Sequence, residues 1–197
     1  MKPHITTSFA VPCLAVIISI AAAAAEKPVD IEHSTIRIHV GKAGLFSAAG
    51  HEHWVTAPIA EGNLDEGEPA HISFRVDARK LTVENDKDLR PDQQAEVQRT
   101  MQTKVLESDQ YPEIDFRSTS VEKTGEATWT VRGDLTLHGQ TRQVSSTVQK
   151  QQAAYAGHCQ IKQTDFGIHP ISVGGVVKVK NELEIEFSIV PAATNTQ

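Results

Sequence analysis

Most of the chain alternates between apolar and polar residues with a period of two, the pattern of β-strands that bury one face. The clearest run is 176–190, where apolar residues from Val177 to Ile189 share a face that only Asn181 interrupts. Further alternating runs span 35–40, 71–81, 113–121, 127–137, 142–149 and 155–163. The pattern therefore predicts seven or eight strands.

Glycines separate several of these runs and predict turns. Such signals occur at Gly62-Asn63, Gly125, Gly139-Gln140 and Gly157. Gly139-Gln140 stands between two alternating runs, which predicts a tight hairpin at this point.

One segment departs from the strand pattern. From Pro91 to Leu106, the apolar residues Val97, Met101 and Val105 recur at every fourth position, which indicates an amphipathic helix. Its apolar stripe is narrow, so we expect the helix on the surface or across one end of the sheet. No crossover helices separate the strands, so a parallel sheet is excluded, and an all-β barrel or sandwich with one inserted helix is expected.

The first 25 residues are typical of a cleaved signal peptide. Lys2 supplies a positive charge, an apolar run extends from Phe9 to Ile20, and Ala23-Ala24-Ala25 fits a cleavage site. A retained N-terminal anchor is the competing interpretation. We expect cleavage, export to the periplasm and one mature domain over residues 26–197. That domain would keep Cys159 as its only thiol and form no internal disulfide.

The overall charge limits the classes of partner. The 197 residues include 19 Lys and Arg against 25 Asp and Glu, a formal net charge of -6. An acidic chain lacks the basic surface that nucleic acid requires, so we expect no nucleic-acid partner.

Three stretches resemble one known family. They are Gly50-His51-Glu52-His53, the run from Tyr111 to Ser118, and the run from Gly133 to Thr141. Together they resemble the YceI-like family of secreted, lipocalin-like proteins, over about Val29 to Val190. The resemblance implies an eight-stranded antiparallel lipocalin-like barrel with one inserted α-helix. It also implies an apolar tunnel that binds a polyisoprenoid or a similar long-chain lipid.

We expect ligand contacts mainly from the predicted inward faces of the strands. Burying each CH₂ of a lipid tail contributes about 0.8 kcal/mol, so such a ligand needs few polar contacts. The alternative is that the same residues fill a solid core, which would leave an interaction module without a ligand. The candidate ligand-binding residues are Ile38, Phe74, Phe116, Trp129, Leu135, Phe166, Phe187, His51 and His53.

His51-Glu52-His53 carries the second functional hypothesis. In a strand, this spacing turns both imidazoles to one side, as paired metal ligands are turned. A third ligand would have to come from a carboxylate or from one of His33, His39, His138 and His169. That arrangement would make the protein a metal-dependent hydrolase or isomerase.

The sequence contains no CxxC and no HExxH motif. We therefore predict a carrier without a cofactor, a metal or a catalytic step. Its partner would be an isoprenoid or other long-chain lipid, with transient membrane contact and a monomeric or homodimeric state.

Overall fold

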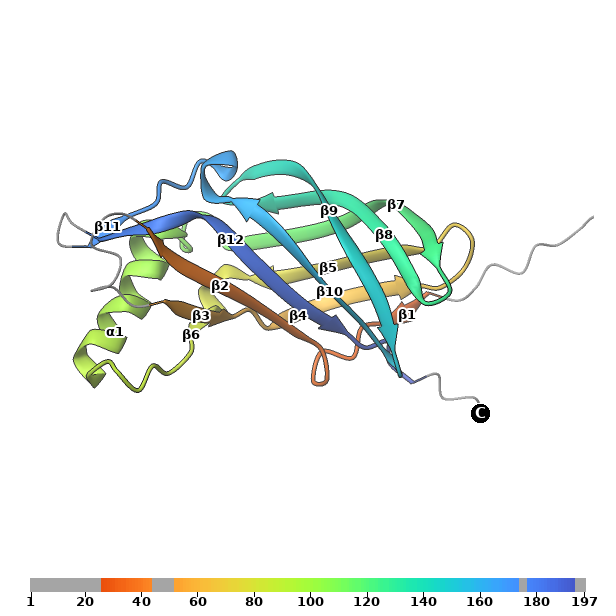
Figure 1. Cartoon of the computed structure of the whole chain (residues 1–197), viewed down its shortest axis with the longest axis horizontal. Helices are drawn as coiled ribbons and strands as arrows, with labels where there is room; N and C mark the ends of the chain where they lie inside the picture. The colour runs from red at the N-terminus through yellow and green to blue at the C-terminus, as the bar shows by residue number, and fades with distance from the viewer. Residues whose placement is uncertain (1–25, 44–51, 174–176, 194–197) are drawn as a thin grey trace, which may run out of the picture.

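The computed structural model describes residues 26–43, 52–173 and 177–193. Within these residues the chain forms one antiparallel sheet with a helix at one end (Figure 1). Its strands are β1 (Lys27–Pro28), β2 (Thr35–Ala43), β3 (His53–Thr56), β4 (Ile59–Asp65), β5 (His71–Asp77), β6 (Thr82–Val83), β7 (Glu113–Gly125), β8 (Thr128–Leu137), β9 (Gln140–Gln151), β10 (Ala154–Lys162), β11 (Ser172–Val173) and β12 (Val177–Ile189). The α-helix α1 spans Pro91–Thr100, and short 3₁₀ turns span Ala78–Lys80 and Gln163–Phe166.

The strand order places β12, the last long strand, beside β2, the first long strand. Neighbours in the sheet follow the path β1-β4-β5-β7-β8-β9-β10-β12-β2-β3-β6, and β11 pairs with β12 off this path. β12 lies antiparallel to β2, with Ile185 opposite Ile38, although a bulge shifts the register between Val179 and Leu183. The apolar residues that alternate along each strand therefore face one shared interior.

The sheet is strongly curled. β3 and β4 follow each other with only Ala57-Pro58 between them, yet β3 pairs with β2 and β4 pairs with β5, near opposite ends of the path. The segment after β1 also connects the two sides of the sheet, because it bonds both β4 and the residue that follows β12. The Val29 N–H donates to the Gly62 carbonyl and the Asp30 N–H to the Val190 carbonyl, each at 2.8 Å. The sheet thus curls back on itself, which is consistent with a lipocalin-like barrel.

The predicted count of eight strands is wrong for the described residues, which form twelve. The extra strands are mostly two to four residues long, too short to show a period of two. The segment from His53 to Asp65 is also split by Pro58, which has no N–H to donate to a strand ladder.

The predicted turns were partly correct. His138 and Gly139 have φ angles of 51° and 70°, so they form the two-residue left-handed turn of a tight hairpin between β8 and β9. By contrast, Gly62 lies inside β4 and Gly157 inside β10, so the turns predicted there are wrong. Both glycines serve close packing instead, because a Cβ on Gly62 would lie 3.0 Å from Phe74 Cβ.

The helix lies across one end of the sheet, one of the two positions that its narrow stripe predicted (Figure 1). α1 continues as a π-helical turn over Met101–Val105, and Val97 and Met101 pack against the core. Glutamine side chains of the helix form hydrogen bonds with the backbone at the edge of the sheet. Gln98 accepts from the Val83 N–H at 2.8 Å and donates to the Leu81 carbonyl at 2.9 Å.

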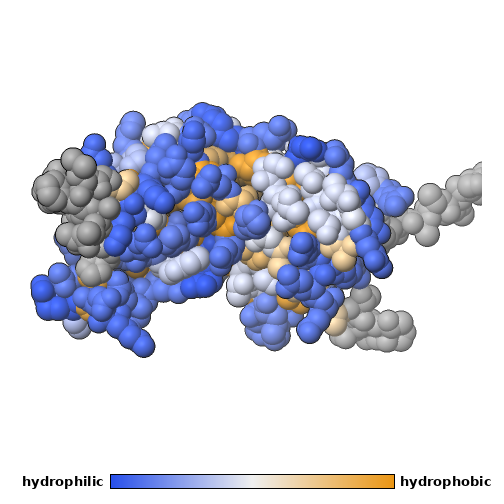
Figure 2. All heavy atoms as spheres, viewed as in Figure 1, coloured by the Kyte–Doolittle hydropathy of each residue, from blue (hydrophilic) through white to orange (hydrophobic). Residues whose placement is uncertain are grey.

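The outside of the sheet is mainly polar. Figure 2 shows hydrophilic residues over most of the visible face, with apolar atoms showing through near its middle. In the described part of the chain, no helix has the length and apolar character needed to cross a membrane.

Phe166 belongs to the second of two buried apolar clusters, together with Leu135, Leu137, Ile161 and Ile168, and is 1% exposed. We expect Phe166→Ala to lower the free energy of unfolding by about 3–5 kcal/mol, because truncation of a buried aromatic ring leaves a cavity. Urea unfolding measures the change. The matched control is Ile31→Ala, which removes a 47% exposed side chain and should change stability by less than about 0.5 kcal/mol. Equal losses in the two variants would contradict this assignment.

Candidate functional site

The curled sheet encloses an apolar cavity of about 820 Å³. The longer strands, from β2 to β12, all contribute inward-facing residues to its wall, and the helix segment, including Val97 and Met101, contributes at one end. A volume of this size falls in the range of about 300–1,000 Å³ that is typical of small-molecule pockets. The inward faces therefore surround a hollow interior, and the solid core considered as an alternative is not what the structure shows.

Most of the predicted ligand-binding residues lie together on this wall. The wall includes Ile38, Phe74, Phe116, Trp129, Leu135, Phe187 and His53. His51 lies outside the described residues. Phe166 is a correction, since among the described residues it is part of the packed cluster and not of the wall. The period-two pattern cannot place it correctly, because Phe166 ends a 3₁₀ turn and not a strand.

Two phenylalanine rings lie against glycines of the sheet. A Cβ on Gly133 would lie 2.5 Å from Phe116 Cζ, and one on Gly157 would lie 2.6 Å from Phe187 Cζ. Both distances are shorter than real carbon contacts, so only glycine leaves room for the rings. Phe116 also stacks on Phe74, with ring centroids 5.3 Å apart. These glycines let large aromatic side chains lie along the wall of the cavity.

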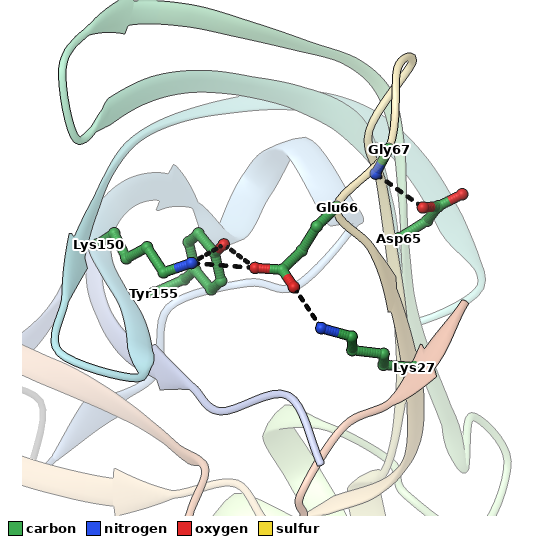
Figure 3. Close-up of polar contacts among 6 residues, drawn as sticks. All are labelled: Lys27, Asp65, Glu66, Gly67, Lys150 and Tyr155. Atoms are coloured by element: carbon green, nitrogen blue, oxygen red, sulfur yellow. Dashed lines mark hydrogen bonds and ion pairs between the residues drawn. The ribbon is translucent and has the colours of Figure 1, made fainter. Parts of the chain in front are cut away.

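A polar cluster stands at the end of the cavity opposite the helix (Figure 3). Glu66 follows β4, and its carboxylate accepts from Lys27 Nζ at 2.6 Å and from Lys150 Nζ at 3.0 Å. The Tyr155 hydroxyl donates to the same carboxylate, and Lys150 Nζ lies 2.9 Å from that hydroxyl. Glu66 and Tyr155 are also part of the cavity wall. We call these four residues the mouth cluster.

The mouth cluster fixes the protonation of its members. Hydrogen bonds from Lys27, Tyr155 and Lys150 lower the pKa of Glu66 from 4.5 to about 2, against the opposing effect of burial. Burial and the neighbouring Glu66 raise the pKa of Tyr155, and the Tyr155 and Glu66 contacts raise the pKa of Lys150. At neutral pH, Glu66 is therefore ionised, Lys150 carries its proton and Tyr155 is a neutral phenol.

Sequence reasoning missed the mouth cluster. Lys27 and Glu66 lie outside the alternating runs, and nothing in the sequence pairs either of them with Lys150. The contact arises because the loop after β4 meets the β9–β10 hairpin across the end of the sheet. Only the curl of the sheet brings these segments together.

The histidines proposed as a third metal ligand are spread over separate sites. His33 bonds Asp30 at 2.9 Å, His39 contacts Glu52 at 3.3 Å, and His138 bonds Glu107 at 3.0 Å. His169 is exposed. Across residues 26–43, 52–173 and 177–193, no three side chains of His, Cys, Asp or Glu are grouped so that they could hold a metal ion.

Cys159 faces the cavity as a free thiol. Burial raises its pKa to about 11, so the thiol stays protonated and unreactive at neutral pH.

The fold and the cavity define a class of protein: a curled antiparallel sheet around an apolar interior. A family model, the YceI-like domain, matches residues 28–190, so the chain belongs to the YceI-like family. The match agrees with the resemblance carried by the sequence motifs.

Individual relatives support the same assignment. A UPF0312 protein of Vibrio cholerae is 29% identical over 199 residues, covering 88% of this chain and 93% of the relative. Burkholderia cenocepacia BcnA has a similar structure, with a TM-score of 0.61 at 17% identity, over 83% of this chain and 99% of that one. A polyisoprenoid binding domain from Saccharophagus degradans gives a TM-score of 0.58 at 12% identity, over 84% and 98%. At these identities the solved structures show a shared fold.

The mouth cluster predicts a pH-dependent contribution to stability. The pKa of Glu66 is lower in the folded protein than its ordinary value of 4.5, so the unfolded chain takes up the proton first as the pH falls. We expect Glu66→Gln to lower the free energy of unfolding by about 1–2 kcal/mol at neutral pH, a modest value for a partly exposed cluster. The difference from wild type should shrink between pH 4.5 and about 2.

Urea unfolding at a series of pH values measures this difference. Glu126→Gln is the matched control, since Glu126 is exposed in the β7–β8 turn at the same end of the sheet. A Glu66→Gln effect that stays constant down to pH 2 would contradict the role of the ionised carboxylate.

Proposed function

We propose that this protein is a binding or carrier protein for a polyisoprenoid or a similar long-chain amphiphile, whose tail lies in the cavity. The observation that carries the proposal is the continuous apolar wall around a volume of about 820 Å³. Such a wall is costly to expose to water and gains free energy when a hydrocarbon chain covers it. No catalytic step is part of the proposal.

The size of the cavity is sufficient for a long hydrocarbon chain. A methylene group takes up about as much space as a water molecule, about 30 Å³ in the liquid, so the cavity has room for roughly 25 such groups. That corresponds to about five isoprene units. At about 0.8 kcal/mol for each buried CH₂, even a partly inserted tail would outweigh the entropy lost on binding. The structural relative from Saccharophagus degradans, described as a polyisoprenoid binding domain, supports the same class of ligand.

We also propose that the mature protein acts in the periplasm after loss of residues 1–25, which lie outside the described part of the chain. The support is the sequence of that segment, in which an apolar run is followed by Ala23-Ala24-Ala25, as in a cleaved signal peptide. A carrier of this kind would exchange its ligand during transient contact with a membrane.

A pair of variants on one strand tests the proposal. Val131 and Thr130 are adjacent on β8, so their side chains point to opposite faces, and Val131 is part of the cavity wall. We expect Val131→Trp to reduce the volume for a ligand and to weaken binding of the fluorophore N-phenyl-1-naphthylamine by about tenfold or more. Thr130→Trp should bind it as wild type does. Geranylgeraniol, an isoprenoid alcohol, should displace the fluorophore from wild type.

Thermal unfolding of both variants separates lost binding from lost folding. If Val131→Trp remains folded and binds the fluorophore as tightly as Thr130→Trp, the ligand does not occupy the cavity and the proposed function is wrong. Failure of geranylgeraniol to compete would contradict the isoprenoid class specifically.

A further inference from the structure

The mouth cluster joins opposite sides of the curled sheet. In the strand order, β5, β7 and β8 lie between β4 and β9, so Glu66 and Lys150 are not neighbours within the sheet. Their side chains nevertheless meet at 3.0 Å, and Figure 3 shows Glu66 reaching from one side toward Lys150 and Tyr155 on the other. The Glu66 side chain therefore extends across this end of the cavity.

The donors of the cluster converge on a single anionic group. Lys27 binds one oxygen of the Glu66 carboxylate, and Lys150 and Tyr155 bind the other. The neighbouring Asp65 also lines the cavity, and its carboxylate accepts from the Gly67 N–H at 2.8 Å and not from either lysine (Figure 3). Within the cluster, two ammonium groups face the one carboxylate of Glu66. This is the arrangement that recognises a carboxylate or a phosphate, because charge-assisted hydrogen bonds to such oxygens are the strong ones.

The cluster also borders directly on the apolar wall. The Trp129 ring meets the Tyr155 ring edge-on, with centroids 5.7 Å apart, and both residues line the cavity. A molecule whose tail fills the cavity would place its polar end among these groups. At the helix end, the described wall holds one cation, Lys104, beside the acidic Glu96, whereas Lys27 and Lys150 both converge on one carboxylate at the mouth cluster.

We propose that Lys27, Lys150 and Tyr155 form a subsite for the anionic headgroup of the ligand, a carboxylate or a phosphate. In the empty protein the Glu66 carboxylate occupies this subsite and crosses the mouth. When an anionic amphiphile enters, its headgroup takes the place of Glu66 and that side chain turns away. This inference rests on the proposed function, since the tail has to occupy the cavity.

Two ligands with the same tail test the subsite. Hexadecanoic acid and hexadecan-1-ol differ only in the headgroup, so the ratio of their dissociation constants isolates its contribution. Displacement of N-phenyl-1-naphthylamine at mildly alkaline pH measures both constants. Wild type should prefer the acid, and Lys150→Gln or Lys27→Gln should reduce that preference by about fivefold to tenfold. Glu66→Gln removes the internal competitor and should increase the preference by a similar factor.

Tyr155→Phe keeps the ring but removes the hydroxyl donor, and it should reduce the preference for the acid while leaving the alcohol bound as in wild type. Lys162→Gln is the matched charge control. Lys162 is an exposed residue on β10, the strand of Tyr155, at its other end. Its substitution should leave the ratio unchanged, and circular dichroism confirms that each variant is folded.

The outcomes are distinct. If both ligands displace the fluorophore but no mouth-cluster variant changes their ratio, the subsite is wrong and the carrier function stands. If neither ligand displaces the fluorophore, the proposed function and the subsite both fail.

Millimolar inorganic phosphate should leave the ratio unchanged, because the headgroup binds together with its tail. Loss of the preference in phosphate would show that a free anion occupies the cluster, which overturns the headgroup assignment.

Discussion

The rest of the structure depends on one constraint with two parts. First, every strand must direct its apolar side chains toward the same interior. Second, those side chains must leave part of that interior empty. The curl of the sheet satisfies the first part, since pairing of β12 with β2 and of β3 with β2 brings all inward faces around one space. To leave the interior empty, the bulky side chains of the wall must lie flat against the sheet. Gly133 beneath Phe116 and Gly157 beneath Phe187 make that possible. The packed cluster around Phe166 shares residues such as Leu135 and Leu137 with the wall of the cavity, so the same side chains contribute to core stability and border the hollow.

The apolar interior is covered differently at its two ends. At one end, a helix lies across the sheet and places Val97 and Met101 against the core, while its glutamines satisfy the backbone of the short strand β6. At the other end, no helix of the described chain is present, and charged side chains meet across the opening. At the polar end, a change in the rotamer of Glu66 alone would open the contact, with no movement of the backbone. The polar end is therefore the one suited to contact with a ligand headgroup.

The sequence predicts what depends on periodicity and fails where the fold depends on distant contacts. The long strands, the helix at Pro91 and the hairpin at Gly139 are encoded locally, and the structure confirms each. The inward faces were also predictable, because strand alternation fixes which side chains point together, and seven of the nine candidate residues line the cavity. The turns expected at Gly62 and Gly157 were wrong because glycine marks close contact as well as turns. The mouth cluster unites Lys27, Glu66 and Lys150 through the curl of the whole sheet, which no local pattern encodes.

The central claim is that the cavity holds a long-chain amphiphile, and mass spectrometry of the protein purified from its native host tests it most directly. The intact protein is measured under non-denaturing conditions and its bound material is then extracted into organic solvent. The account predicts a stoichiometric adduct that is released on extraction and identified as an isoprenoid or other long-chain molecule with an acidic headgroup. A protein that is consistently recovered without any such adduct, and that takes up none when incubated with extracted membrane lipids, would contradict it.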